Sequence, residues 1–146
     1  MKQLWIIIFA SCFVLWACEE ETSSIDNKEL LQDYNPISTD IVATHGEIEN
    51  LDRFKEFFDH VSSGKPDWIR VVSYTEEGDA ILQELDYDGE TIQSKLDSRR
   101  DRFGSGVVER MSCMKLEYTQ NTSRYDHVYE LKECDNDEYN RTVIWY

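Results

Sequence analysis

One apolar run dominates the start of the chain. Leu4 to Ala17 is almost entirely apolar, is preceded by the single charged side chain Lys2, and ends at Cys18, where three glutamates follow. A helix of these 14 residues would rise about 21 Å, against about 30 Å for the hydrocarbon core of a bilayer. The run therefore has the length of a signal-peptide core rather than that of a membrane-spanning helix.

The junction Leu15-Trp16-Ala17-Cys18 resembles the cleavage site of bacterial lipoproteins. The thiol would accept a diacylglycerol group, and the small Ala17 would let the signal peptidase reach the bond. Trp16 departs from the pattern, because that place usually holds a small or β-branched residue. We expect a signal peptide over residues 1–17 and a lipid, with acyl groups such as palmitate, on Cys18. An ordinary secretory signal and an uncleaved N-terminal anchor are the alternatives.

The next twenty residues lack a hydrophobic period. Residues 19–38 are polar and acidic and contain Pro36 near their end. We therefore predict that residues 18–38 form a flexible, lipidated tether and that residues 39–146 form one folded domain.

A single strong helical pattern follows. Apolar residues recur at helical spacing, on one face, at Leu51, Phe54, Phe57, Phe58 and Val61. Asn50 is placed as the N-cap, and Gly64 and Pro66 would end the helix. The pattern predicts a helix over residues 51–63.

The remaining apolar residues favour strands, because they are rich in β-branched and aromatic types. We expect strands at about residues 40–46, 68–75, 80–87, 90–96, 107–118, 125–134 and 141–146. Asp88-Gly89 predicts a two-residue hairpin turn. The fold class is α+β, with one main helix packed on a largely antiparallel sheet of five to seven strands.

The formal net charge is −15, so binding to nucleic acid or to anionic head groups is disfavoured. A cationic partner, a metal cation or simple solubility would suit such a surface. The one basic cluster holds Arg99, Arg100 and Arg102. These arginines either dock an anionic group or pair with acids of the same domain.

Four cysteines divide by position. Cys12 lies in the expected signal peptide and Cys18 is the expected lipid acceptor, which leaves Cys113 and Cys134. We predict a disulfide between them, worth about 3 kcal/mol in the chain-entropy model. Two free thiols, or a metal or redox pair, are the alternatives. A hairpin turn centred on residues 121–122 would not bring the two together, so the disulfide requires a longer or asymmetric connection.

Catalytic and metal motifs are weak. His45, His60 and His127 are not at metal-ligand spacing, and Ser105 lies in Gly-Ser-Gly rather than in GxSxG. His45, beside Gly46, is expected in a turn. We therefore expect no catalytic residue, no metal and no cofactor.

Several strings resemble an uncharacterised domain family of Bacillus-type lipoproteins. They are residues 45–54, residues 69–79, Tyr87-Asp88-Gly89 and residues 97–104, within a match of about residues 39–135. The resemblance implies a lipoprotein outside the cytoplasm. It brings no substrate, cofactor or catalytic residue.

These observations favour a non-enzymatic binding domain. We expect it on the outer face of the cell membrane, anchored in membrane lipid through Cys18, with an unidentified protein or cell-envelope partner. An aromatic contact face is available from Tyr118, Tyr125, Tyr129, Tyr139, Trp145 and Tyr146, although these could equally be core residues. The rivals are an inhibitor or immunity-type protein whose acidic surface blocks a basic partner, and a hydrolytic or metal-dependent enzyme.

Overall fold

The computed structural model describes residue 31, residues 33–136 and residues 141–146. The expected signal peptide and Cys18 lie outside the described residues. The elements, in chain order, are β1 (Ile41–Thr44), β2 (Glu47–Glu49), α1 (Leu51–Ser63), β3 (Asp67–Tyr74), β4 (Ala80–Tyr87), β5 (Ile92–Asp97), β6 (Val108–Gln120), β7 (His127–Cys134) and β8 (Thr142–Trp145).

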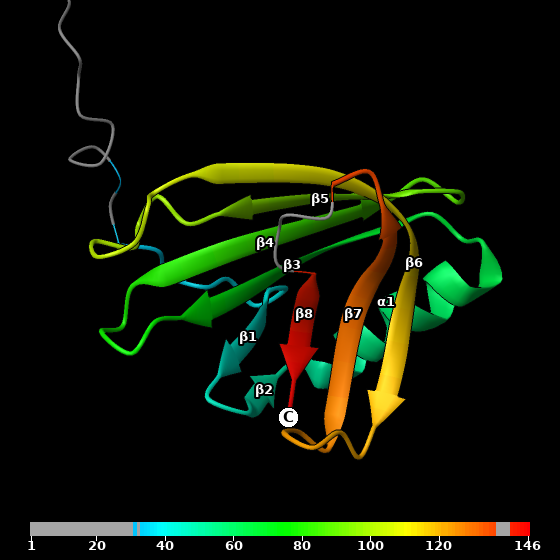
Figure 1. Cartoon of the computed structure of the whole chain (residues 1–146), viewed down its shortest axis with the longest axis horizontal. Coiled ribbons are helices and arrows are strands. Elements are labelled where there is room, and N and C mark those ends of the chain that lie inside the picture. Colours follow the sequence, from blue (N-terminus) through cyan, green and yellow to red (C-terminus); the bar gives the residue numbers. More distant parts are fainter. Residues whose placement is uncertain (1–30, 32, 137–140) are drawn as a thin grey trace, which may run out of the picture.

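The strands form one mixed sheet in the order β2-β1-β3-β4-β5-β6-β7-β8 (Figure 1). Within the described chain, β1 and β3 are parallel neighbours and every other pair is antiparallel. The largely antiparallel sheet with one helix is confirmed. The sheet has eight strands rather than five to seven, because β2, with the single apolar residue Ile48, was too short to predict.

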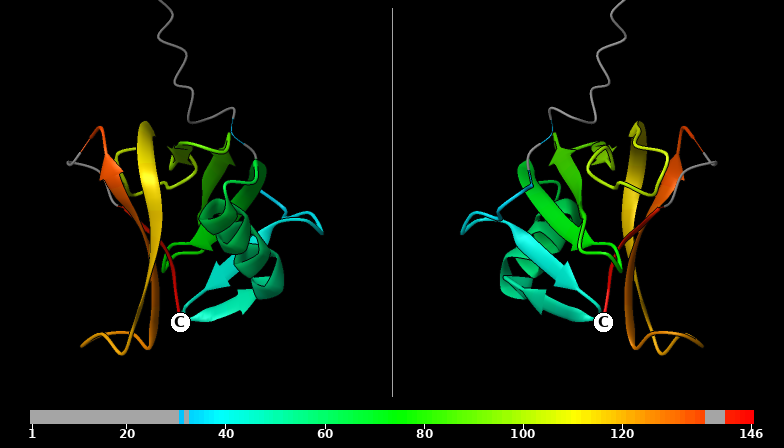
Figure 2. Two further views of the ribbon diagram at one scale, coloured as in Figure 1. Left: turned by 90° about the vertical axis from the view of Figure 1, so that its right-hand side faces the viewer. Right: turned by 90° about the vertical axis from the view of Figure 1, so that its left-hand side faces the viewer.

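The sheet bends into an open curl, and α1 lies inside it (Figure 2). The helix has the predicted bounds, and its Phe54 and Phe57 are fully buried. They pack against buried residues drawn from strands at both ends of the sheet, among them Ile41, Ile69, Val71, Leu85, Ile92, Leu116, Tyr129, Leu131 and Ile144. One helix therefore fills the concave side of the sheet and holds the curl in place.

Both ends of α1 lie where the sequence predicted them. Gly64 ends the helix with a left-handed backbone (φ 71°), as expected. Asn50 is the N-cap residue, as predicted, but its side chain makes no capping hydrogen bond. The Asn50 amide instead donates to the carbonyl oxygens of Ser38 and Asp40, which ties the helix start to the segment ahead of β1.

The β4–β5 turn also differs from the prediction. Tyr87 pairs with Ile92, so the connection has four residues rather than the two-residue Asp88-Gly89 turn. The Asp88 carboxylate accepts hydrogen bonds from the amides of Glu90 and Thr91, and these bonds lower its pKa. This Asx-type arrangement competes with the tighter turn that the Asp-Gly pair predicted.

The disulfide between Cys113 and Cys134 is present, and the two residues are directly opposite each other on β6 and β7. Its register follows from the turn, in which Thr122 donates a backbone hydrogen bond to Tyr125. The turn is therefore centred on Ser123 and Arg124, two residues later than a tight turn at 121–122. The disulfide therefore needs no longer or asymmetric connection, because a turn two residues later in the chain brings the two cysteines opposite each other.

The arginine cluster pairs with acids of the same domain, which is one of the two alternatives expected from the sequence. The Arg99 guanidinium contacts Asp97 at 2.8 Å and lowers the pKa of that carboxyl group. Arg102 contacts the buried Asp79 at 2.7 Å. The Arg102–Asp79 pair holds the β5–β6 loop against the β3–β4 turn.

The segment ahead of β1 packs on the convex face. Tyr34 lies against Arg70 and Arg100, 5.2 Å and 5.6 Å from the two guanidinium carbons. Its hydroxyl donates to Asp40 at 2.7 Å, and burial together with that bond raises its pKa to about 12. The last residues of the expected tether therefore already contact the domain.

Candidate functional site: a cleft at the seam of the sheet

The curl leaves an opening between β8, at one edge of the sheet, and the ends of β1 and β3. We call this opening the seam cleft. It has a volume of about 470 Å³ and is lined by Ala43, His45, Gly46, Ser73, Tyr74, Glu76, Arg124, Tyr125, Thr142, Val143, Ile144 and Trp145. This volume is within the range of small-molecule sites.

The β1–β2 turn forms one end of the cleft. Thr44 pairs with Glu47, so the turn consists of His45 (φ 50°) and Gly46 (φ 95°). Positive φ at both positions defines a type I′ turn, so the turn role expected for His45 is confirmed. A Cβ atom on Gly46 would lie 3.3 Å from the ring of Trp145, which means that the turn is seated on β8.

The lining combines both signs of charge with aromatic rings. His45 Nε2 lies 3.7 Å from Glu76 Oε1, and their side chains are 56% and 88% exposed. On the opposite wall the Tyr125 and Trp145 rings stack with centroids 4.1 Å apart, and the Arg124 guanidinium lies 5.3 Å from the Tyr125 ring. The charged groups of the cleft are therefore open to solvent and only loosely paired.

The edge of β8 adds main-chain groups to this wall. His127 and Tyr146 exchange two backbone hydrogen bonds across β7 and β8. In an antiparallel ladder the next residue turns its amide and carbonyl away from that partner strand. Trp145 accordingly directs its N–H and C=O toward the cleft side of β8.

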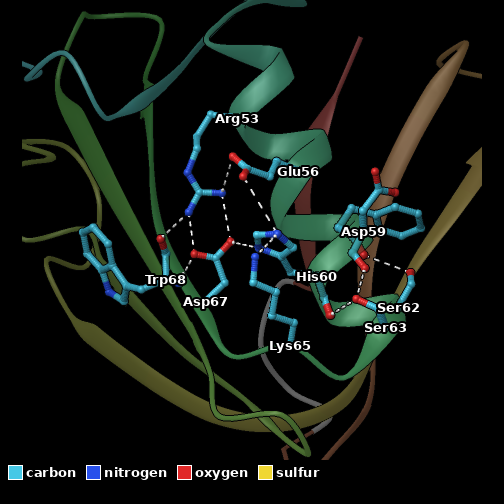
Figure 3. A network of polar contacts seen from close by, with 10 residues as sticks. Arg53, Glu56, Asp59, His60, Ser62, Ser63, Lys65, Asp67 and Trp68 are labelled. Carbon is cyan, nitrogen blue, oxygen red and sulfur yellow. Dashed lines mark hydrogen bonds and ion pairs between the residues drawn. The ribbon is translucent and has the colours of Figure 1, made fainter.

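A second polar cluster lies on the helix side of the molecule (Figure 3). We call it the helix network; it consists of Arg53, Glu56, His60, Lys65 and Asp67. Arg53 donates two hydrogen bonds to the Asp67 carboxylate, at 2.9 Å and 2.6 Å. His60 Nδ1 lies 2.7 Å from the same carboxylate, and Lys65 Nζ lies 2.9 Å from His60 Nε2.

The Asp67 carboxylate is the shared acceptor of the network. A carboxylate only accepts, so His60 Nδ1 donates to it. Burial raises the pKa of Asp67, but the hydrogen bonds from Arg53 and His60 outweigh it, and the net pKa is lowered. Because its members form hydrogen bonds with one another, we interpret the helix network as a structural link between α1 and the start of β3.

The predicted aromatic face divides into two groups. Tyr125 and Trp145 lie in the seam cleft, whereas Tyr118, Tyr129 and Tyr146 lie around His127 on another part of the sheet. Tyr129 is buried, and burial raises its pKa. Tyr139 falls outside the described residues.

Sequence reasoning singled out His45 and named Tyr125 and Trp145 as possible contact residues, but it missed the charged neighbours of His45 in the cleft. Glu76 and Arg124 are single charged residues in turns, and no local pattern marks them. Within the described chain no group of three metal-binding side chains occurs. None of the described helices has the length and hydrophobicity needed to span a bilayer.

The fold and the cleft define a small α+β domain: a curled sheet around one helix, with an open seam. A family model covers residues 38–129, and the chain belongs to that family, described as Domain of unknown function (DUF4362). The resemblance to an uncharacterised domain family is thereby confirmed. The matched residues include His45, Glu76 and Arg124, whereas β8 lies beyond them. Comparison with curated proteins and with solved structures finds no match.

Proposed function

We propose that this protein is a non-enzymatic binding domain, held on the outer face of the cell membrane by lipid on Cys18, and that the seam cleft binds a short peptide. The cleft is the observation that carries the proposal, because it combines a volume of about 470 Å³, charges of both signs and a strand edge. The proposed partner is thus a protein or cell-envelope component that offers an extended peptide segment.

The anchor is supported by the apolar run that ends at Cys18 and by the acidic residues that follow it. Lipid on the first residue of the mature chain would retain the domain at the membrane, because more than one acyl chain gives stable anchoring. Mass spectrometry of the natural N-terminus tests this directly. We expect acylated Cys18 as the first residue and release or lack of processing for Cys18→Ser; an unmodified N-terminus contradicts the anchor.

A binding role suits the open geometry of the cleft. His45 and Glu76 make one long contact and are largely exposed, so no tight hydrogen bond orients the imidazole as a general base requires. Binding demands less, since Glu76 and Arg124 can meet the charged groups of a peptide while Trp145 pairs with its backbone. Peptide addition at a strand edge is a recurring mode of recognition.

The peptide proposal is tested by titrating the ¹⁵N-labelled protein with trialanine, which has an extended backbone and both charged termini. We expect amide shifts concentrated in residues 43–46 and 142–145. Arg124→Ala should weaken binding about tenfold, the value of one charge-assisted hydrogen bond. Arg110→Ala, on β6 outside the cleft, is the matched control. Shifts that are absent or that lie elsewhere would contradict this site.

A further inference from the structure

The β5–β6 loop displays a largely exposed aromatic side chain. Phe103 is 78% exposed, the most exposed of the large apolar residues in the described chain. It follows Arg102, whose side chain is 67% exposed. An aromatic ring beside an arginine is a pairing typical of membrane–water interfaces.

The loop that carries Phe103 is held in place by hydrogen bonds. The Asp101 carboxylate accepts from the amides of Phe103 and Gly104, at 2.9 Å and 2.8 Å. The amide and the Nε of Arg102 both donate to the buried Asp79. Because the loop is already ordered, burying Phe103 in a partner would require little further loss of backbone entropy.

The same end of the molecule receives the chain that leads back to Cys18. Tyr34 contacts Arg100 of the loop, and Asp33, Tyr34 and Arg100 line one small cavity of about 50 Å³. Figures 1 and 2 both place the first described residues beside the loop between β5 and β6. Leu31 is thirteen residues after Cys18, so the chain between them spans at most about 45 Å. A lipid on Cys18 would therefore keep the point where this chain joins the domain within that distance of the bilayer.

Charge at the loop does not oppose this orientation. The whole chain has a net charge of −15, so most of its surface is repelled by anionic lipid. At the loop, Arg99 and Arg100 pair with Asp97, and Arg102 pairs with Asp79. With Asp101 included, these charges balance, so the loop does not add to the repulsion.

We propose that the β5–β6 loop is a membrane-contact surface, with the Phe103 ring inserted among the lipids of the leaflet that holds the anchor. This inference rests on the proposed lipid anchor at Cys18. It orients the domain, because contact through Phe103 brings the loop end to the bilayer. The anchor supplies the affinity, and the loop sets the orientation.

The test uses chains that begin at Cys18, which retain every described residue. With Cys113 and Cys134 in a disulfide, Cys18 is the free thiol, and it can be coupled to a maleimide lipid in vesicles of phosphatidylcholine and phosphatidylglycerol with brominated acyl chains. Bromine quenches tryptophan that enters the hydrocarbon. Phe103→Trp is compared with the unsubstituted chain, whose own tryptophans set the baseline.

The matched control is Met114→Trp. Met114 is also exposed, at 52%, but it lies on β6, about 20 Å along the strand from the end that joins the loop. We expect additional quenching for Phe103→Trp and none for Met114→Trp. The proposal would be overturned if Phe103→Trp were quenched no more than the unsubstituted chain. It would also be overturned if Phe103→Trp and Met114→Trp showed the same increase in quenching. Because the coupling is chemical, this result is independent of natural lipidation, which mass spectrometry of the native N-terminus decides separately.

Discussion

The helix network and the seam cleft each bring together a histidine, a carboxylate and an arginine. They differ in how closely these groups contact one another and in how exposed they are. In the helix network the Asp67 carboxylate accepts three hydrogen bonds of 2.6–2.9 Å from Arg53 and His60. In the seam cleft the single ion pair, between His45 and Glu76, is 3.7 Å long and largely exposed.

The comparison shows that residue types alone do not mark a functional site. The helix network is enclosed between α1 and β3, so its polar groups bond to one another and stabilise the fold. The groups of the seam cleft remain available to a ligand, because the sheet edges stand apart there. Each of the following variants is designed to challenge this assignment of one set to stability and the other to binding.

The largest contrast is expected between the two carboxylates. Asp67→Asn removes the charge that pairs with Arg53 and weakens the bond to His60, and it should lower the free energy of unfolding by about 2–3 kcal/mol. Glu76→Gln should change it by less than about 0.5 kcal/mol, as is usual for an exposed residue. Urea denaturation of both variants beside the unsubstituted chain measures the difference. Similar losses from the two substitutions would remove the distinction between the clusters.

At low pH, Asp67→Asn should no longer be less stable than the unsubstituted chain. The pKa of Asp67 is lower in the folded protein than its value of about 3.9 in an unfolded chain. Its carboxylate therefore contributes stability that is fully present above the unfolded pKa and is lost as the pH falls from there through the lower folded pKa. The stability gap between the unsubstituted chain and Asp67→Asn should be widest at neutral pH and should narrow below about pH 4.

A neutral reference separates this effect from general acid destabilisation. Gln83 is buried and its side-chain amide donates to Ser94, but neither side chain titrates. Gln83→Ala should therefore lose about the same stability at pH 7 and at pH 3. If the stability lost by Asp67→Asn is also the same at pH 7 and at pH 3, the carboxylate is not held in the charged form by Arg53 and His60.

The sequence predicted the elements better than it predicted either polar cluster. The helix was defined because five apolar residues share one face and Gly64 ends it. The disulfide followed from the number and position of the cysteines. Asp67 was not linked to His60, because their meeting depends on how the connection from Gly64 to Pro66 redirects the chain.

The seam cleft could not be predicted from local sequence patterns, for a different reason. Its walls come from the β1–β2 turn and from β8, about one hundred residues apart in the chain, and they meet only because the sheet curls around α1. Periodicity predicts which face of a strand is buried, but it does not give the curvature of the sheet. His45 was noticed for its neighbour Gly46, whereas Trp145 was noticed only as an aromatic residue near the C-terminus.

The smallest expected effect concerns the contact between the β1–β2 turn and Trp145, at one end of the cleft. Gly46→Ala and Gly78→Ala each place a side chain at positive φ, 95° and 87°, and each should lower stability by about 1–2 kcal/mol. A Cβ atom on Gly78 would meet nothing within 4 Å, whereas one on Gly46 would meet the Trp145 ring at 3.3 Å. Urea denaturation should therefore show a further loss of about 0.5 kcal/mol for Gly46→Ala, since the ring must move by a few tenths of an ångström. Because that movement shifts a wall of the cleft, Gly46→Ala should also alter the affinity for trialanine, and Gly78→Ala should not. Equal stability and equal affinity for the two variants would mean that the turn does not rest on Trp145 and does not shape that wall of the cleft.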